Sequence, residues 1–143
     1  MKNKMFREKD DLTKSFFNQF KKVKGEEKTM EDFVEYLDSL PVTRGIGTKK
    51  MDLYSFNEMN TITMLDGITG TITCRNAQNY NKKFLVDNKL YKPSPLMCWL
   101  LMGFSEEQYN IVSGFEDKHL YNQAGNSIVV DVVENILLEL FGD

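Results

Sequence analysis

Apolar residues recur with helical spacing in the first forty positions of the chain. One set recurs at intervals of four, four and three residues, which predicts an amphipathic helix over residues 10–24. Its members are Leu12, Phe16, Phe20 and Val23. A second helix is predicted from Thr29, a suitable N-cap residue, to about Ser39. Its buried stripe would consist of Met30, Phe33, Val34 and Leu37. Residues 43–48 then read as a loop.

The middle of the chain changes from helical spacing to short β-type runs. The predicted strands cover residues 61–65, 70–74, 84–86 and 89–91. Asp66-Gly67 joins the first pair and Asp87-Asn88 joins the second, and both dipeptides are hairpin turn signals. These runs predict a small antiparallel sheet.

The last third of the chain returns to helical signals. Ser94-Pro95 supplies an N-cap and a proline at the first helical position. Ser105-Glu106-Glu107-Gln108 opens the next helix with a capping box. Residues 113–125 read as irregular, and residues 127–141 form a strongly apolar run whose length favours a helix.

The apolar positions of residues 127–141 cover more than one stripe of a helix. Such a helix is either central to the core or meets a partner, which includes a second copy of the chain. Taken together, the pattern predicts one α+β domain over residues 1–143. It combines N-terminal helices, a small antiparallel sheet and a C-terminal helical segment, without a doubly wound sheet.

Composition agrees with one folded domain. The chain has 143 residues, of which 41% are hydrophobic and 12% aromatic, so a wholly disordered chain is excluded. No run approaches the roughly 20 apolar residues of a membrane helix, and the charged start lacks the pattern of a signal peptide. Cys74 and Cys98 make no disulfide framework, and a bacterial cytoplasm is expected. With His119 as the single histidine, we expect no metal site.

Charge is distributed unevenly along the chain. The net charge is +3 over residues 1–50, +1 over residues 51–104 and −7 over residues 105–143. A basic middle could contact the phosphates of DNA. The candidate DNA-contacting residues are Arg75, Lys82 and Lys83. The acidic end could instead meet a basic protein surface. The candidate partner-binding residues are Glu106, Glu107, Glu116 and Asp117.

Three segments resemble consecutive motifs of one enzyme family. Residues 121–130 read Tyr-Asn-Gln-Ala-Gly-Asn-Ser-Ile-Val-Val. Residues 91–104 read Tyr-Lys-Pro-Ser-Pro-Leu-Met-Cys-Trp-Leu-Leu-Met-Gly-Phe, and residues 66–74 read Asp-Gly-Ile-Thr-Gly-Thr-Ile-Thr-Cys. In order and spacing they resemble the last motif, the preceding motif and the end of the target-recognition region of DNA (cytosine-5) methyltransferases. The resemblance covers residues 61–143 and leaves the mostly helical residues 1–60 unmatched.

The resemblance also exposes differences from an active methyltransferase. The family has a Pro-Cys nucleophile, a Glu-Asn-Val motif and a Gly-rich loop for S-adenosylmethionine, and the sequence contains none of these. We therefore expect no cofactor and no enzymatic activity, since 143 residues leave no room for the catalytic half. Cys74 and Cys98 are expected to be buried structural thiols.

Polar positions within the motifs have changed. The family's Arg, Glu and Arg, which brace the catalytic loop, are replaced by Tyr91, Met97 and Leu100. The scaffold residues Pro95, Gly103 and Phe104 are kept. Asn126 and Ser127 are either remnants of the family's cofactor contact or, with Gly125 in a turn, the cap of the final helix.

Two functions compete on these observations. The first is a methyltransferase-derived interaction protein, a phage-type anti-defence inhibitor of a CRISPR or restriction nuclease, to which residues 1–60 would add a binding surface. The alternative is the target-recognition subunit of a split DNA cytosine-5 methyltransferase, with a separate catalytic chain as partner. The changed charges at the brace positions favour the first. A free-standing DNA-binding module is a third option, which the net charge of −3 disfavours.

Overall fold

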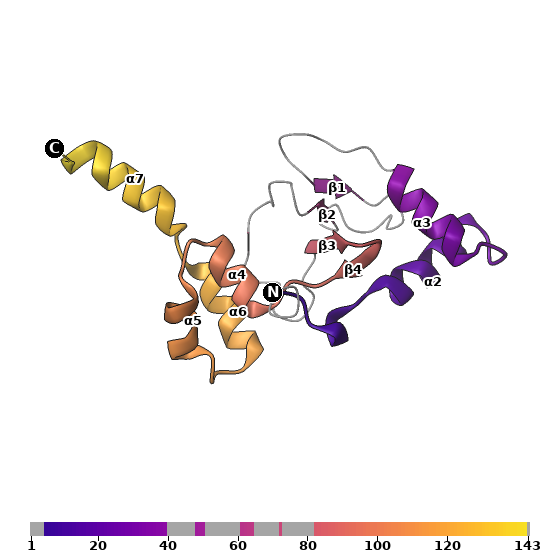
Figure 1. Ribbon diagram of the computed structural model, residues 1–143, viewed down its shortest axis with the longest axis horizontal. Helices are drawn as coiled ribbons and strands as arrows, with labels where there is room; N and C mark the ends of the chain where they lie inside the picture. The colour runs from indigo at the N-terminus through magenta and orange to yellow at the C-terminus, as the bar shows by residue number, and fades with distance from the viewer. Residues whose placement is uncertain (1–4, 40–47, 51–60, 65–71, 73–81, 143) are drawn as a thin grey trace. The chain divides into compact units, whose positions relative to one another are not determined.

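The computed structural model describes residues 5–39, 48–50, 61–64, 72 and 82–142. The chain divides into two compact units (Figure 1). Unit 1 comprises residues 1–5, 71–80 and 93–143, and unit 2 comprises residues 6–70 and 81–92. The expectation of a single domain over residues 1–143 stays a prediction.

Two amphipathic helices of unit 2 lie where the spacing predicts them. A short 3-10 turn, η1 (Glu8–Asp10), precedes α2 (Thr13–Lys24), and α3 (Met30–Ser39) follows. Thr29 caps α3 as expected. Its hydroxyl accepts from the Asp32 N–H at 3.2 Å, while Asp32 accepts from the Thr29 N–H at 2.7 Å. The hydrogen bonds that the Asp32 carboxylate accepts from the backbone N–H and the hydroxyl of Thr29 lower the pKa of this carboxyl.

Two positions of the predicted apolar stripes are wrong. Val23 is 55% exposed and Met30 is 38% exposed, and both lie in terminal turns of their helices.

The sheet of unit 2 is mixed. It contains β1 (Thr48–Lys50), β2 (Thr61–Met64), β3 (Lys82–Val86) and β4 (Lys89–Tyr91), in that order. The outer pairs are antiparallel, but β2 and β3 run parallel, so the prediction of an antiparallel sheet is wrong for this pair. The intervening residues 65–81 are long enough for a parallel crossover. The predicted strand over 70–74 lies almost wholly outside the described residues, and β1 begins in the predicted loop.

The β3–β4 hairpin is confirmed together with its turn. Asp87 and Asn88 have φ angles of 49° and 61°, the left-handed conformation that a two-residue hairpin turn needs at both positions. Asp and Asn tolerate this conformation better than most residues.

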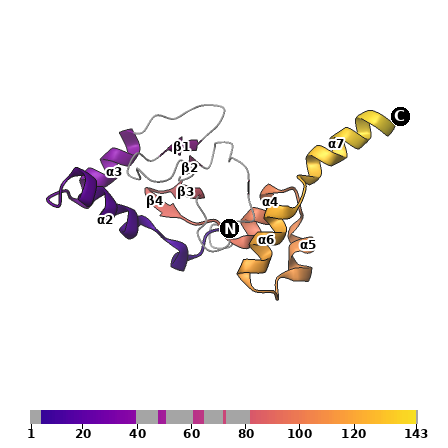
Figure 2. The same ribbon diagram turned by 180° about the vertical axis from the view of Figure 1, so that it is seen from behind.

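The core of unit 2 lies between the helix pair and one face of the sheet. It consists of Phe16, Phe20, Phe33, Leu37, Ile62, Leu85 and Leu90. Hydrogen bonds also connect the edge strand β4 to the N-terminal end of α2. The Leu12 N–H donates to the Leu90 carbonyl at 2.7 Å, and the Leu90 N–H donates to Thr13 Oγ1 at 3.0 Å. The two views of Figures 1 and 2 show α2 and α3 beside each other in this unit.

Unit 1 is helical in its described residues. It contains α4 (Pro95–Leu101), α5 (Glu106–Val112), α6 (Asp117–Asn126) and α7 (Val130–Phe141). The prediction that residues 113–125 are irregular is wrong, because they contain most of α6. Its buried side chains, Leu120, Tyr121 and Ala124, lie among polar residues that conceal the helical stripe.

A small core holds α4 and α6 together. Its buried members are Ile72, Cys98, Met102, Tyr121 and Ala124. Helices at both ends of the chain and a small sheet confirm the predicted α+β class. Within the described ranges, no helix has the length and apolar character needed to cross a membrane.

Candidate functional site

The segment 91–104 forms a strand end, a connection and α4. Ser94 caps the helix as predicted, since its hydroxyl accepts from the Met97 N–H at 3.1 Å, and Pro95 occupies the first turn. Gly103 follows the helix with a φ of 87°, a conformation that suits glycine.

The three changed brace positions carry packed side chains. Met97 is buried at 7% exposure and Leu100 is half-buried, both in unit 1. Tyr91 belongs to unit 2, where its ring centre lies 5.6 Å from that of Phe6. Apolar and aromatic side chains at these positions fit packing rather than charged pairing.

The segment 121–130 forms the second half of α6 and the connection to α7. The Tyr121 hydroxyl donates to the Pro93 carbonyl at 2.7 Å in the interior of unit 1. Gly125 lies within α6, and the Ser127 hydroxyl donates to the Ala124 carbonyl at the end of this helix. The expectation of a turn at Gly125 and a side-chain cap on the final helix is therefore wrong. Val129 occupies the N-cap of α7 and makes no side-chain cap.

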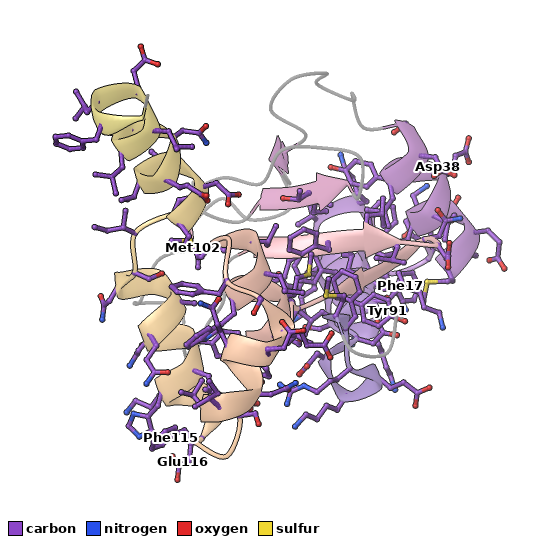
Figure 3. The ribbon with its side chains drawn as sticks, turned by 60° about the vertical axis from the view of Figure 1, so that its left-hand side comes forward. Phe17, Asp38, Tyr91, Met102, Phe115 and Glu116 are labelled. Carbon is purple, nitrogen blue, oxygen red and sulfur yellow. The ribbon has the colours of Figure 1, made fainter. Side chains whose placement is uncertain are left out.

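The two motif segments meet where α4 ends and α7 begins. The Val130 N–H donates to the Met102 carbonyl at 2.9 Å. A Cβ atom at Gly103 would lie 3.2 Å from both Val130 Cβ and Asp131 Oδ1, so the glycine permits this close approach. Figure 3 shows Met102 near the start of α7, whereas Phe115 and Glu116 lie in the α5–α6 connection, at the far end of the unit. No motif or spacing in the sequence predicted this contact.

The helix α7 extends from this hydrogen-bonded N-terminal end (Figure 1), and none of its residues is buried. Six large apolar side chains are between 50% and 78% exposed. They are Val132, Ile136, Leu137, Leu138, Leu140 and Phe141. An apolar hollow of about 660 Å³ runs along the side lined by Val133, Leu137 and Phe141. Burial of one such side chain stabilises by about 1.5–3 kcal/mol, so the exposed helix favours a covering surface.

The candidate DNA-contacting residues are not brought together by the described structure. Arg75 and the side chain of Lys82 lie outside the described residues. Lys83 is 7% exposed, and its Nζ lies 6.0 Å from the centre of the Phe16 ring. Desolvation, followed by the charge of Lys92, lowers the pKa of Lys83 to about 8. This interior placement does not suit a phosphate contact.

The candidate acidic residues occupy the starts of two helices. Glu106 and Glu107 lie in the first turn of α5, and Asp117 lies in the first turn of α6, next to its N-cap Glu116. Carboxylates are favoured at these ends by the helix dipole. A hydrogen bond with Ser105 lowers the pKa of Glu107. Their positions have a local structural cause, and partner binding by them stays a prediction.

Candidate catalytic and metal-binding groups are few in the described part of the chain. Cys98 is fully buried, as expected of a structural thiol, and Cys74 lies outside the described residues. His119 is exposed on α6. Among the described residues, no three His, Cys, Asp or Glu side chains gather into a group that could hold a metal ion.

Comparison with known proteins decides the family. The profile of the family described as C-5 cytosine-specific DNA methylase matches residues 1–142. The chain belongs to this family. The match includes residues 1–60, for which the motifs had indicated no relative. The cytosine-5 methylase motifs described above therefore lie within a family match that is much longer than the motifs themselves.

Curated relatives of this cytosine-5 methylase chain include methyltransferases of Bacillus phages. The orphan methyltransferases M.SPBetaI of phage SPbeta and M.Phi3TI of phage phi3T are each 46% identical over 54 residues, which is 36% of this chain and 12% of theirs. The orphan methyltransferase M.Rho11sI of phage rho11s is 44% identical over 54 residues, again 36% of this chain and 11% of its own. The matched segment thus spans about one eighth of the length of these relatives.

Proposed function

We propose that the chain supplies the target-recognition end and last two motifs of a DNA cytosine-5 methyltransferase. Methyl transfer would be carried out by a catalytic part that holds the nucleophile and the cofactor loop. The observation that carries the proposal is α7. The hydrogen bond from Val130 to Met102, between the two motif segments, holds the N-terminal end of α7, and the apolar side chains of this helix are exposed.

The chemistry of the described residues supports this division of labour. The 143 residues contain no Pro-Cys dipeptide, and the thiol of Cys98 is fully buried in a structural core. A cytosine-5 methyltransferase attacks its base through an accessible thiolate. The chain would therefore act without a catalytic group of its own, and the catalytic part would supply one.

The extent of the family match supports a methyltransferase origin for residues 1–60. The inhibitor hypothesis assigned residues 1–60 to a new binding surface, because no relative was evident there. The family profile includes these residues, so they need no separate origin.

Complementation in trans tests the proposal. M.SPBetaI is prepared without the segment that matches this chain, and transfer of radiolabelled methyl groups from S-adenosylmethionine to duplex DNA is measured with and without the chain added. We expect methylation only in the mixture. A variant with Gly103→Val, which disturbs the contact between the motif segments, should restore less activity than the wild type. Absence of methylation, both in the mixture and in a covalent fusion of the two parts, would overturn the proposal.

A second candidate function rests on one observation, the acidic end of the chain. Residues 105–143 carry eight acidic residues and one basic residue, Lys118. Such a surface could occupy the basic channel of a CRISPR or restriction nuclease. Inhibition of a purified nuclease at stoichiometric amounts of the chain would favour this candidate, whereas unchanged cleavage rates would remove it.

A further inference from the structure

The helix α2 carries a row of exposed polar side chains opposite its buried side. Its buried residues, Phe16 and Phe20, belong to the core of unit 2. Residues four positions apart lie above one another on a helix, so Lys14, Asn18 and Lys22 form one row. With about 3.6 residues per turn, Asn18 lies directly opposite the midpoint between Phe16 and Phe20. All three residues of the row are exposed, and we call them the outward row of α2.

The two helices of unit 2 differ in the sign of their charge. The helix α2 contains four lysines and no acidic residue, whereas α3 contains four acidic residues and no Lys or Arg. The charged residues are Lys14, Lys21, Lys22 and Lys24 in α2, and Glu31, Asp32, Glu35 and Asp38 in α3. The two helices pack against each other through the ring of Phe20, which contacts those of Phe33 and Tyr36. A basic helix therefore lies beside an acidic one.

Two of the four lysines of α2 lie off the outward row. Lys24 reaches toward α3, since its Nζ lies 5.6 Å from the centre of the Tyr36 ring. Lys21 lies over the ring of Phe17, with 5.5 Å between its Nζ and the ring centre, and pairs with the Glu26 carboxylate at 3.7 Å. The outward row thus presents Lys14 and Lys22 on the side of α2 that faces neither the core nor α3.

Acidic residues also flank α2 in the sequence, and three of them have local partners. Asp10 pairs with Arg7 at 2.8 Å, and Asp11 accepts a hydrogen bond from the Thr13 N–H at 2.8 Å. Glu26 pairs with Lys21, as described above. These local pairs offset part of the negative charge at the two ends of the helix. The outward row between them keeps its positive character.

We propose that the outward row of α2 contacts the phosphates of duplex DNA. Lys14 and Lys22 approach separate phosphates of one strand, and the Asn18 amide donates to a phosphate oxygen between them. The polymer is DNA because the chain belongs to a family of DNA methylases, and this inference rests on the proposed function for that substrate. The phosphate contact is thereby assigned to α2 instead of β3, where Lys83 is buried.

The length of the row fits a DNA strand. Eight residues separate Lys14 from Lys22, which is about 12 Å at 1.5 Å per residue. One strand of duplex DNA carries a phosphate about every 3.4 Å along the helix axis, so the row spans about three or four phosphates. Lys and Asn side chains commonly donate to phosphate oxygens, and such contacts position a protein on the duplex without reading its sequence.

The acidic helix limits where the DNA can lie. Packed helices are about 8–10 Å apart, which is comparable to the Debye length of about 8 Å at physiological salt. Phosphates above α3 would therefore be repelled by its four carboxylates. The strand is expected to follow α2 on the side away from α3, where Lys14 and Lys22 lie.

The salt dependence of DNA binding by the full chain tests this contact. Dissociation constants are measured by fluorescence anisotropy for two labelled duplexes of unrelated sequence, between about 50 and 200 mM salt. Lys14→Gln combined with Lys22→Gln should weaken binding about 10-fold at the lowest salt concentration. It should also reduce the slope of log K against log salt concentration by about 2, because two phosphate contacts are lost. Both duplexes should be affected equally.

A matched pair of substitutions controls for net charge. Lys24→Gln combined with Lys118→Gln removes the same charge, but Lys24 lies toward α3 and Lys118 belongs to unit 1. This pair should weaken binding less than about threefold and change the slope by less than about 0.5. Asn18→Ala should weaken binding about 2- to 10-fold without a change of slope, because an amide displaces no counterion. Since all the substituted lysines are exposed, the circular dichroism spectra should not change.

Specific outcomes would overturn the inference. They are absence of DNA binding by the wild-type chain at the lowest salt concentration, equal effects of the two lysine pairs, or a slope that the Lys14/Lys22 pair leaves unchanged. A protein-binding role for the row would appear as unchanged DNA binding with lost affinity for M.SPBetaI that lacks the matching segment, and it would also overturn the inference.

Failure of the proposed function is distinguishable from failure of the phosphate contact. If the Lys14/Lys22 pair weakens DNA binding as expected, but neither the mixture with the catalytic part nor the covalent fusion methylates DNA, the contact stands and the function fails. If the mixture methylates DNA and the Lys14/Lys22 pair changes neither methylation nor the salt dependence of DNA binding, the function stands and the contact fails.

Discussion

Lys83 carries a cationic side chain from β3 into the interior of unit 2. The side chain is 7% exposed and approaches the Phe16 ring of α2. Burial first, and then the charge of Lys92, lowers the pKa of Lys83 from 10.5 to about 8. Lys83→Met keeps an unbranched side chain and removes the charge. We therefore expect the variant to be more stable than the wild type at neutral pH.

The expected gain follows from the pKa difference. The values of 10.5 and about 8 for Lys83 correspond to about 3 kcal/mol, at 1.36 kcal/mol per pKa unit. Between these values the unfolded chain binds more protons than the folded chain, so the free energy of unfolding rises with pH over this range. Below about pH 8 both states are protonated and the full penalty is present. At pH 7 the free energy of unfolding of the variant should exceed that of the wild type by about 1–3 kcal/mol. The gain is smaller than the full penalty because the substitution also removes the hydrogen-bonding capacity of the amine.

Urea unfolding at several pH values measures this effect. The free energy of unfolding is obtained from far-UV circular dichroism for the wild type, for Lys83→Met and for the control Lys89→Met, whose side chain is exposed on β4. Other groups titrate alike in all three proteins, so the difference between wild type and variant isolates Lys83. That difference should be largest near pH 7 and shrink steadily as the pH rises toward 10.5. The control should follow the wild type.

Two results would refute this reasoning. A Lys83→Met variant less stable than the wild type at pH 7 would mean that the buried ammonium contributes more through its contacts than it costs by desolvation. A stability difference that stays constant from about pH 7 to 10.5 would mean that the pKa of Lys83 is not lowered by folding.

Further predictions concern unit 1, where Trp99 fluorescence follows urea unfolding. Gly103→Ala should destabilise by about 1–3 kcal/mol, because φ is 87° and the added Cβ crowds the start of α7. Gly114→Ala meets nothing within 4 Å and should change little, and equal effects at both glycines would contradict the explanation. Ser105→Ala removes the capping box of α5 and should cost about 1 kcal/mol; an unchanged urea midpoint would show that the cap is dispensable. Tyr121→Phe leaves a buried carbonyl without its donor and should cost about 1–3 kcal/mol, and a neutral result would contradict the role of this hydrogen bond.

Local signals explain most of what the sequence predicted correctly. The helices of unit 2, the β3–β4 hairpin and the Ser94 and Ser105 caps depend on residues within a few positions of one another. The helix α6 was missed because polar residues surround its few buried side chains. Its apolar positions at Leu120, Tyr121 and Ala124 were the signal that could have revealed it.

Non-local features were not predictable in the same way. The parallel pairing of β2 with β3 depends on the path of residues 65–81, for which no short motif specifies a direction. The interior position of Lys83 had a partial signal, since strand alternation places it on the same face as Leu85. At the candidate site, the apolar run over residues 127–141 predicted the final helix. Only the folded chain reveals how Gly103 and Val130 hold the N-terminal end of this helix against the end of α4.

The interleaving of the two units along the chain has a consequence for dissecting the protein. A cut between residues 60 and 61, the boundary suggested by the motifs, would separate α2 and α3 from the strands β2, β3 and β4 that they cover. The remaining piece would expose Ile62, Leu85 and Leu90 to water. A piece of the chain that keeps unit 2 intact must therefore contain both 6–70 and 81–92, joined by residues 71–80 or by a designed linker. Deletion of residues 93–143 alone keeps both stretches, whereas a deletion from the N-terminus that extends beyond residue 5 removes part of unit 2.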